Sequence, residues 1–242
     1  MAERAALVTG GSSGIGLSIA RMLRDEGYAL TLVSRTREKI ERAAAELHAS
    51  AVAADVADPE ACRRTVDEHL ERHGRLDVLV NSAGTGIAGT VEQMPAKHVD
   101  LQLGVNLRGL FLMAQAAIPS LRETQGWIVN LASIAGTMPT PGLAMYGATK
   151  AGIISLTRSL NEELDADGIR AVAICPSFVD TPMAQWSGIE PDKMIQPEDC
   201  AEIVRMCLRL SPYARVPQVI VENVGPRNAD VLLRGDVLAL ES

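Results

Sequence analysis

Tyr146 and Lys150 stand four residues apart in the run Tyr-Gly-Ala-Thr-Lys, and Ser133 precedes Tyr146 by 13 residues. Residues four apart share one face of an α-helix, so the ammonium group of Lys150 would lie beside the phenol of Tyr146. A free tyrosine has a pKa of about 10, and a nearby positive charge lowers that pKa by stabilising the phenolate. The spacing therefore predicts an acid–base pair that exchanges a proton with a substrate.

A glycine-rich segment, Thr9-Gly-Gly-Ser-Ser-Gly-Ile-Gly16, links an apolar run to an amphipathic stretch near the start of the chain. A strand, a glycine turn and a helix N-terminus together present backbone N–H groups and a helix dipole to a pyrophosphate. The spacing is G-x-x-x-G-x-G rather than G-x-G-x-x-G, and a tight turn without a ligand is the alternative. The residues expected to bind a dinucleotide here are Gly10, Ser12, Ser13, Gly14, Ile15 and Gly16.

The second apolar run ends in Val33-Ser34-Arg35, where NAD-binding proteins place an acidic side chain against the ribose 2′-hydroxyl. A guanidinium at Arg35 can hold a 2′-phosphate through two hydrogen bonds, whereas a carboxylate would repel it. We therefore expect Ser34 and Arg35 to bind the cofactor and to favour NADP(H) over NAD(H). A solvated arginine near a helix start is the alternative.

These groups must be positioned by the elements around them, which alternate along the whole chain. Apolar runs predict strands, and amphipathic stretches predict helices between them. The expected strands are 5–9, 29–33, 50–54, 76–80, 126–131, 169–174 and 218–222, and the expected helices are 14–26, 36–48, 58–72, 95–103, 106–123, 144–166 and 197–210. The pattern predicts an α/β fold: a Rossmann-like, doubly wound, mainly parallel seven-stranded sheet with helices on both faces.

Two loops follow the carboxyl ends of predicted strands, where ligands bind in open α/β sheets: 84–90 and 176–196. At 242 residues the chain suits one α/β domain, and no linker or repeat divides it, so we expect a single domain over 1–242. The tail 223–242 has apolar runs at 231–233 and 237–240 that could pack on the domain or on a second subunit.

Charge and composition exclude several classes of protein. The net charge of −7, without runs of basic residues, argues against a nucleic-acid surface. We see no signal peptide, no apolar run of the ~18 residues that span a bilayer, and no CxxC spacing among the four cysteines. His69 and His73 have a metal-like spacing but no third ligand nearby, so we expect a solvated helix face and no metal. A cytoplasmic protein without membrane contact is expected.

The combined motifs resemble those of the short-chain dehydrogenase/reductase family, in its single-domain type of approximately 250 residues. The resemblance extends from about Ala5 to Met183. Beyond the glycine segment it includes Asp55-Val56, Asn81-Ser82-Ala83-Gly84 and Asn106, followed by Ser133, Tyr146 and Lys150 in the family's order. Pro176 is followed by Ser177 where the family has glycine, which removes the freedom of a glycine at positive φ and adds a hydroxyl.

The resemblance implies roles for further residues. Asp55 and Val56 would border the adenine, and Asn81, Ala83 and Gly84 would line the ribose side, with a purely structural Asn81 as an equal alternative. Lys150 would also bind the nicotinamide ribose, Pro176, Val179 and Thr181 would border the nicotinamide carboxamide, and Asn106 would anchor a water that links Lys150 to solvent. The alternatives without a catalytic role are that Ser133 caps a turn, that Asn106 satisfies backbone groups at a helix break, and that Lys150 is a solvated charge on a helix.

The expected function is an NADP(H)-dependent oxidoreductase that interconverts a ketone or aldehyde and an alcohol. Ser133 and Tyr146 would hold the carbonyl oxygen while Tyr146 exchanges the proton. The segments 84–91, 134–145 and 178–195 contain few charges, which indicates a small to medium, largely apolar substrate. The alternatives are a 3-oxoacyl thioester reductase, a non-catalytic NADP(H) sensor and a structural interaction module. By resemblance, the helices with Asn106 and Tyr146 would pair in a homodimer or homotetramer.

Overall fold

The seven strands found within residues 3–224 lie in one sheet, in the order β3-β2-β1-β4-β5-β6-β7. The computed structural model describes residues 3–224, so the predicted tail from residue 225 onward, with both of its apolar runs, lies outside the described residues. The strands are β1 Ala5–Thr9, β2 Ala29–Ser34, β3 Ser50–Ala53, β4 Val78–Asn81, β5 Trp127–Leu131, β6 Arg170–Pro176 and β7 Gln218–Val221. Every neighbouring pair is parallel.

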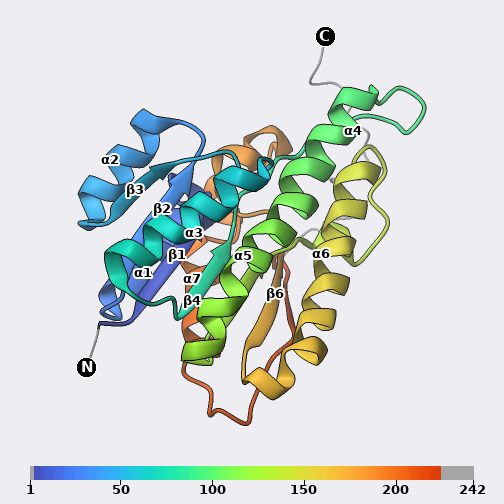
Figure 1. Cartoon of the computed structure of the whole chain (residues 1–242). Helices are drawn as coiled ribbons and strands as arrows, with labels where there is room; N and C mark the ends of the chain where they lie inside the picture. Colours follow the sequence, from blue (N-terminus) through green and yellow to red (C-terminus); the bar gives the residue numbers. More distant parts are fainter. Residues whose placement is uncertain (1–2, 225–242) are drawn as a thin grey trace.

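Helices cover both faces of this sheet, which confirms the predicted doubly wound α/β fold. They are α1 Gly14–Asp25, α2 Arg37–Leu47, α3 Pro59–His73, α4 Ala96–Gln102, α5 Gly109–Thr124, α6 Ala144–Glu163 and α7 Pro197–Leu208. One layer of the core packs α1, α2 and α7 on the sheet, and the other packs α3, α5 and α6. In Figure 1 the green α5 and yellow α6 lie in front of the strands.

The central strands are apolar on both sides because helices bury both of their faces. Every residue of β1, β4 and β5 is buried. Parallel strands in this position read as continuous apolar runs rather than as alternating ones, since neither face meets water. This explains why short apolar runs were sufficient to locate these strands in the sequence.

The two helices expected at 95–103 and 106–123 form one continuous rod, Ala96–Thr124. A π-helical segment, Leu103–Arg108, joins α4 to α5 without a break. By length and composition this rod could cross a membrane, but 44% of its most apolar window is buried inside the fold. Core helices meet the same criterion, and this one packs on the sheet beside α3 and α6.

The strand order reverses between β1 and β4, which opens a crevice at the carboxyl ends of these two strands. The hydroxyl of Thr9, the last residue of β1, accepts hydrogen bonds from the backbone N–H groups of Ser82 and Ala83 at 3.1 and 3.2 Å. The ends of both strands are thereby tied together directly beneath the glycine turn. The glycine turn after β1 and the loop after β4 are therefore held at a fixed distance from each other.

The prediction of a solvated face for His69 is wrong. His69 is fully buried between α3 and the sheet, where Nδ1 lies 2.8 Å from the hydroxyl of Thr31 in β2. Its Nε2 lies 3.0 Å from the carbonyl oxygen of Arg75, so both ring nitrogens have partners. The charged residues around it in sequence lie on the other face of the helix. Within residues 3–224, no group of three His, Cys, Asp or Glu side chains is placed to hold a metal ion.

Candidate functional site

A cleft of about 1080 Å³ opens at the carboxyl ends of the strands. It brings together most of the residues expected at the site: Gly10, Ser12, Ser13, Gly14, Ile15, Ser34, Arg35, Val56, Ala83, Gly84, Ser133, Tyr146, Lys150, Pro176, Val179 and Thr181. The expected residues Gly16, Asp55, Asn81 and Asn106 do not line it. Both predicted loops contribute to its wall, with Gly84–Gly89 on one side and Pro176–Trp186 on the other.

The turn between β1 and α1 requires glycines because the backbone of neighbouring segments approaches it closely. Gly10 has a φ of +66°, and a Cβ there would lie 2.7 Å from the carbonyl oxygen of Ser82. A Cβ on Gly16 would lie 2.4 Å from the carbonyl oxygen of Gly10. Gly16 therefore acts beneath the turn, where it lets α1 start close to β1. The open turn and helix start fit a pyrophosphate, which needs N–H groups free of covering side chains.

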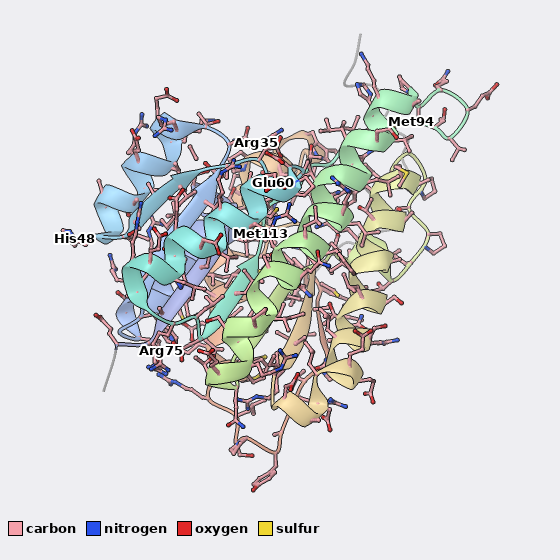
Figure 2. The ribbon with its side chains drawn as sticks, viewed as in Figure 1. Arg35, His48, Glu60, Arg75, Met94 and Met113 are labelled. Carbon is pink, nitrogen blue, oxygen red and sulfur yellow. The ribbon has the colours of Figure 1, made fainter. Side chains whose placement is uncertain are left out.

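The far end of the cleft, beyond the end of β2, carries two cations. Arg35 and Lys39 both line the cleft, together with the hydroxyl-bearing Ser34 and Thr36. Neither cation forms an ion pair within residues 3–224, whereas neighbouring Arg37 pairs with Glu41 at 3.3 Å. Figure 2 shows Arg35 at the same end of the molecule as Met94, which lines the opposite part of the cleft.

Lys39 also lines the cleft and was missed in the sequence. It stands in the first turn of α2, four residues after Arg35, which precedes that helix and its cap Thr36. Two cations in one part of the cleft suit a doubly charged phosphate better than a single hydroxyl. The arrangement can bind a phosphate at this end of the cleft.

Ser133, Tyr146 and Lys150 meet at the end of the cleft that lies away from Arg35 and Lys39. Ser133 follows β5 and caps a short 3₁₀ turn, because its hydroxyl accepts a hydrogen bond from the N–H of Ala135 at 3.2 Å, as the capping alternative predicts. The Ser133 hydroxyl lies near enough to the Tyr146 phenol to lower its pKa. Lys150 lies beneath the tyrosine, with Nζ 5.5 Å from the centre of its ring and 2.8 Å from the carbonyl oxygen of Leu131.

The electrostatics of this group differ from the expectation in one respect. Burial raises the pKa of Tyr146, and the neighbouring Ser133 hydroxyl opposes that rise without reversing it. Burial lowers the pKa of Lys150 to about 8, with the nearby thiol of Cys175 acting in the opposite direction. Burial therefore outweighs the amine beneath the ring in setting the direction of the Tyr146 shift. In this state the phenol of Tyr146 stays protonated near neutral pH.

Asn106 lies behind the cleft in the π-helical segment and is buried. Its amide oxygen accepts from the N–H of Thr85 at 2.8 Å, and its amide nitrogen donates to the Thr85 carbonyl at 2.8 Å and to the Thr149 hydroxyl at 3.1 Å. The side chain thus fastens the loop after β4 to α6. A Cβ on Gly84 would lie 3.7 Å from Lys150 Nζ, so this loop also packs against the lysine.

Asp55 and Asn81 have structural partners away from the cleft. The Asp55 carboxylate accepts from the N–H of Ala57 at 2.9 Å. The Asn81 amide donates to the amide oxygen of Asn130 at 3.0 Å, which joins β4 to β5 inside the sheet. For Asn81 the structural alternative is the one that this geometry supports. Val56, next to Asp55, does line the cleft.

An apolar lobe adjoins Tyr146 on the side away from the cations. Leu143, Phe178, Ala184 and Met194 form its buried base, and Tyr146, Trp186 and Ile189 pack against them. The rings of Phe178 and Trp186 meet edge to face, with centres 5.9 Å apart. Met94 and His98 also line this end of the cleft and were not anticipated from the sequence. The lobe offers apolar contact directly beside the two hydroxyls.

Comparison with known proteins agrees with this geometry. The family model described as short chain dehydrogenase matches residues 4–190. An uncharacterised oxidoreductase of Staphylococcus epidermidis is 34% identical over 225 residues, which cover 92% of this chain and 98% of that protein. An alcohol dehydrogenase from the archaeon Thermococcus sibiricus, complexed with 5-hydroxy-NADP, superposes with a TM-score of 0.86 at 30% identity and covers 93% of this chain and 98% of its own. A 3-ketoacyl-(acyl-carrier-protein) reductase from Brucella melitensis, complexed with NADH, gives 0.83 at 32% identity, with 90% and 96% covered.

Proposed function

The chain is an oxidoreductase of the short chain dehydrogenase family, and from this premise we propose that it interconverts a ketone or aldehyde and an alcohol with NADP(H). The observation on which the proposal depends is the meeting of the Ser133 and Tyr146 hydroxyls in a cleft that also holds the glycine turn. Similar structures contain NADP or NADH compounds, which supports a nicotinamide cofactor. The cofactor, when bound, would supply the hydride.

The side chains provide the proton and the polar contacts. Ser133 and Tyr146 donate hydrogen bonds to the carbonyl oxygen of the substrate, and they stabilise the negative charge that develops there. The phenol then gives its proton to that oxygen, which suits a tyrosine whose pKa is raised by burial. Proton transfer from a placed group typically contributes about 10²–10⁴ in rate. Lys150, whose pKa burial lowers to about 8, places a cation beneath the Tyr146 ring, where it stabilises the phenolate left after proton transfer.

The preference for NADP(H) is supported by Arg35 and Lys39. Both line the cleft at the end of β2, and neither has an ion-pair partner within residues 3–224. A 2′-phosphate would bring two negative charges to this point, and its oxygens match the fork of a guanidinium. A carboxylate from the protein, which a 2′-hydroxyl would need, does not line this part of the cleft.

The apolar lobe supports a small to medium, largely apolar carbonyl compound as the substrate. Phe178, Leu143 and Trp186 offer contacts to carbon atoms, and the described residues that line the cleft include no Asp or Glu. The similarity to the Brucella reductase favours a 3-oxoacyl thioester as the second candidate. Its large acidic carrier would need basic residues beside the lobe, and apart from the buried Lys150 the described cleft-lining cations are Arg35 and Lys39, beyond the end of β2.

The exposed face of the long helix supports self-association. Leu103 and Phe111 are exposed by 38% and 49%, and they lie on one face with Leu107, which packs beside Gly152 of α6. Apolar side chains repeated every four residues on a helix surface are typical of a helix interface. We infer a homodimer or homotetramer through this face. All four cysteines are free and buried, which fits the cytoplasm as the compartment.

Replacement of Tyr146 by Phe tests the proposed function. The purified variant should lose about 10²–10⁴ of its rate of NADPH oxidation with a competent ketone, because the ring stays and the proton donor is removed. Its affinity for NADPH, measured by fluorescence titration, should stay within about twofold of the wild type.

Tyr28→Phe is the matched control. Tyr28 is a buried tyrosine that receives a hydrogen bond from Arg4 and lies just before β2, at the end of the sheet opposite the cleft. Its loss should leave turnover unchanged. Unimpaired turnover in Tyr146→Phe would refute the mechanism. Tight NADPH binding by the wild type, with no turnover across a broad panel of ketones, aldehydes and acyl thioesters, would favour the sensor instead.

A further inference from the structure

The loop after β4, residues 84–89, borders both the proton donor and the apolar lobe. A Cβ on Gly86 would lie 3.5 Å from the ring of Tyr146, so the backbone of the loop lies directly against that ring. Ala88 packs on the buried base of the apolar lobe, and Ile87, between these two residues, lines the cleft. The position of this backbone therefore sets the width of the space in which a substrate beside Tyr146 must fit.

Both ends of this loop are fastened to the elements that flank the cleft. At its start, the Asn106 amide bonds the N–H and the carbonyl oxygen of Thr85, each at 2.8 Å. At its end, the N–H of Gly89 donates to the carbonyl oxygen of Gly142, just before α6, at 2.8 Å. Residues 86–88, which face Tyr146 and the lobe, lie between these two attachments.

Gln102 holds the middle of the loop. Its side-chain oxygen accepts from the N–H of Ile87 at 3.2 Å, and its amide nitrogen donates to the carbonyl oxygen of His98, one turn earlier in α4, at 3.3 Å. The side chain is fully buried, whereas the other residues of α4 are half-buried or exposed. Burial of an amide is unfavourable unless its polar atoms find partners, and here the oxygen and the nitrogen each find one.

The spacing of the two amides along the long helix matches the spacing of the loop. Gln102 and Asn106 stand four residues apart, and they bond Ile87 and Thr85, which stand two residues apart. Four helical residues and two extended residues both cover about 6 Å. The loop therefore runs along the helix in the opposite direction, and alternate residues of the loop are attached to it.

We propose that Gln102 is a positioning residue for the substrate, which it affects through the loop that it holds. By keeping the Ile87 N–H in place, it fixes residues 86–88 at the distance from Tyr146 that an apolar substituent of the carbonyl compound requires. Gln102 does not line the cleft, so it acts on the substrate only through this loop. The inference rests on the proposed function, because it takes the space beside Tyr146 as the place of the substrate.

Gln102→Met tests this directly, because it removes the acceptor and keeps the length of the side chain. With cyclohexyl methyl ketone, whose ring would occupy the lobe, KM should rise about 3- to 10-fold, as for the lost contact of about one methylene group. The kcat should stay within about twofold, because α6 still holds Tyr146. The KM for acetone, which is too small to reach the loop, and the Kd for NADPH should also stay within about twofold. Gln115→Met, the same change at an exposed position of α5, should alter none of these values.

Gln102→Glu separates positioning from a general loss of stability. A carboxyl group keeps an acceptor for the Ile87 N–H, but a buried charge should lower the melting temperature more than methionine does. The KM for cyclohexyl methyl ketone should nevertheless stay closer to the wild-type value than it does in Gln102→Met. An unchanged KM in Gln102→Met, an equal rise for acetone, a raised Kd for NADPH, or a KM that follows the melting temperature across the two variants would overturn the proposal.

Hydrogen exchange measures the attachment without turnover. The amides of residues 84–89 should exchange faster in ligand-free Gln102→Met than in Gln115→Met, because the Ile87 N–H loses its partner. Equal exchange in the two variants would overturn the proposal.

Binding of the ketone separates this inference from the proposed function. Trp186 packs on the lobe, whereas Trp127 is buried at the start of β5, so quenching of tryptophan fluorescence reports the Kd of cyclohexyl methyl ketone. If the wild type reduces no carbonyl compound, a Kd that rises in Gln102→Met would uphold the inference and overturn only the proposed function. An unchanged or unmeasurable Kd in that case would overturn both.

Discussion

Acidification should destabilise this protein through one buried histidine. The fold keeps His69 in its neutral form because the ring is fully buried and bridges the Thr31 hydroxyl and the Arg75 carbonyl oxygen. Burial lowers its pKa to about 4, and the ring of His73, 4.9 Å away, acts in the same direction. The hydrogen bond to Arg75 and the carboxylate of Asp77 oppose the change without cancelling it.

The size of the effect follows from the two pKa values. The unfolded chain binds a proton at His69 near pH 6.5, and the folded chain resists this proton until about pH 4. Protons therefore favour the unfolded state throughout this window, so the free energy of unfolding falls as the pH falls. Each pKa unit corresponds to about 1.4 kcal/mol, which gives a loss of about 2 kcal/mol from pH 7 to pH 5 and about 3 kcal/mol by pH 4.

Urea unfolding followed by circular dichroism at about pH 7 and about pH 5 measures this loss. His69→Gln, which cannot take up a proton, should be less stable at pH 7 but should lose about 2 kcal/mol less than the wild type between the two pH values. The control is His48→Asn, at an exposed site with a left-handed backbone that asparagine tolerates. Figure 2 shows His48 at the outer end of α2. Equal pH dependence in wild type and His69→Gln would refute the reasoning.

Three further predictions concern the cofactor end, the glycine turn and the helix face. Arg35→Glu should weaken NADPH binding about 10- to 100-fold and leave NADH binding nearly unchanged, whereas Arg37→Glu should affect neither, as read by fluorescence titration. Gly16→Ala should lower the free energy of unfolding by about 1–3 kcal/mol, because the new methyl group would collide with the Gly10 carbonyl, and urea unfolding checks this. Phe111→Asp should shift the oligomer toward a smaller species in light scattering; an unchanged mass would contradict the interface.

Those parts of the site that depend on local spacing could be predicted from the sequence. The four-residue interval between Tyr146 and Lys150 is a helical repeat, and the observed helix places the amine beneath the ring as that repeat requires. The contact of Gly16 with the Gly10 carbonyl likewise forms within one turn, whereas the contact of Gly10 with Ser82 crosses to the segment after β4. A contact within one turn involves few residues, so the residue type at each position is enough to indicate the local backbone conformation.

The features that could not be predicted depend on contacts between elements that are far apart in the sequence. The burial of His69 depends on the contact between α3 and β2, which its charged sequence neighbours conceal. Lys39 reaches the cleft because α2 packs at one particular angle beside the end of β2. The pKa of Tyr146 is set by the protein that surrounds it rather than by the nearby cation. Periodicity specifies a helix face, but it does not specify the partner of that face.

Asn106 shows how one extra residue in a helix changes the role of a side chain. A regular helix over 96–124 would turn this amide away from the direction that it takes after the wider π-helical turn. In the observed register all of its hydrogen bonds go to Thr85 and Thr149, so the loop after β4 cannot move independently of the helix that carries Tyr146 and Lys150. Both donors of the Asn106 amide nitrogen are used in these bonds, so a water held here would pair with the remaining lone pair of the amide oxygen or with the backbone of the π-helical segment. The same side chain thus keeps the wall of the cleft and the proton donor at a constant separation.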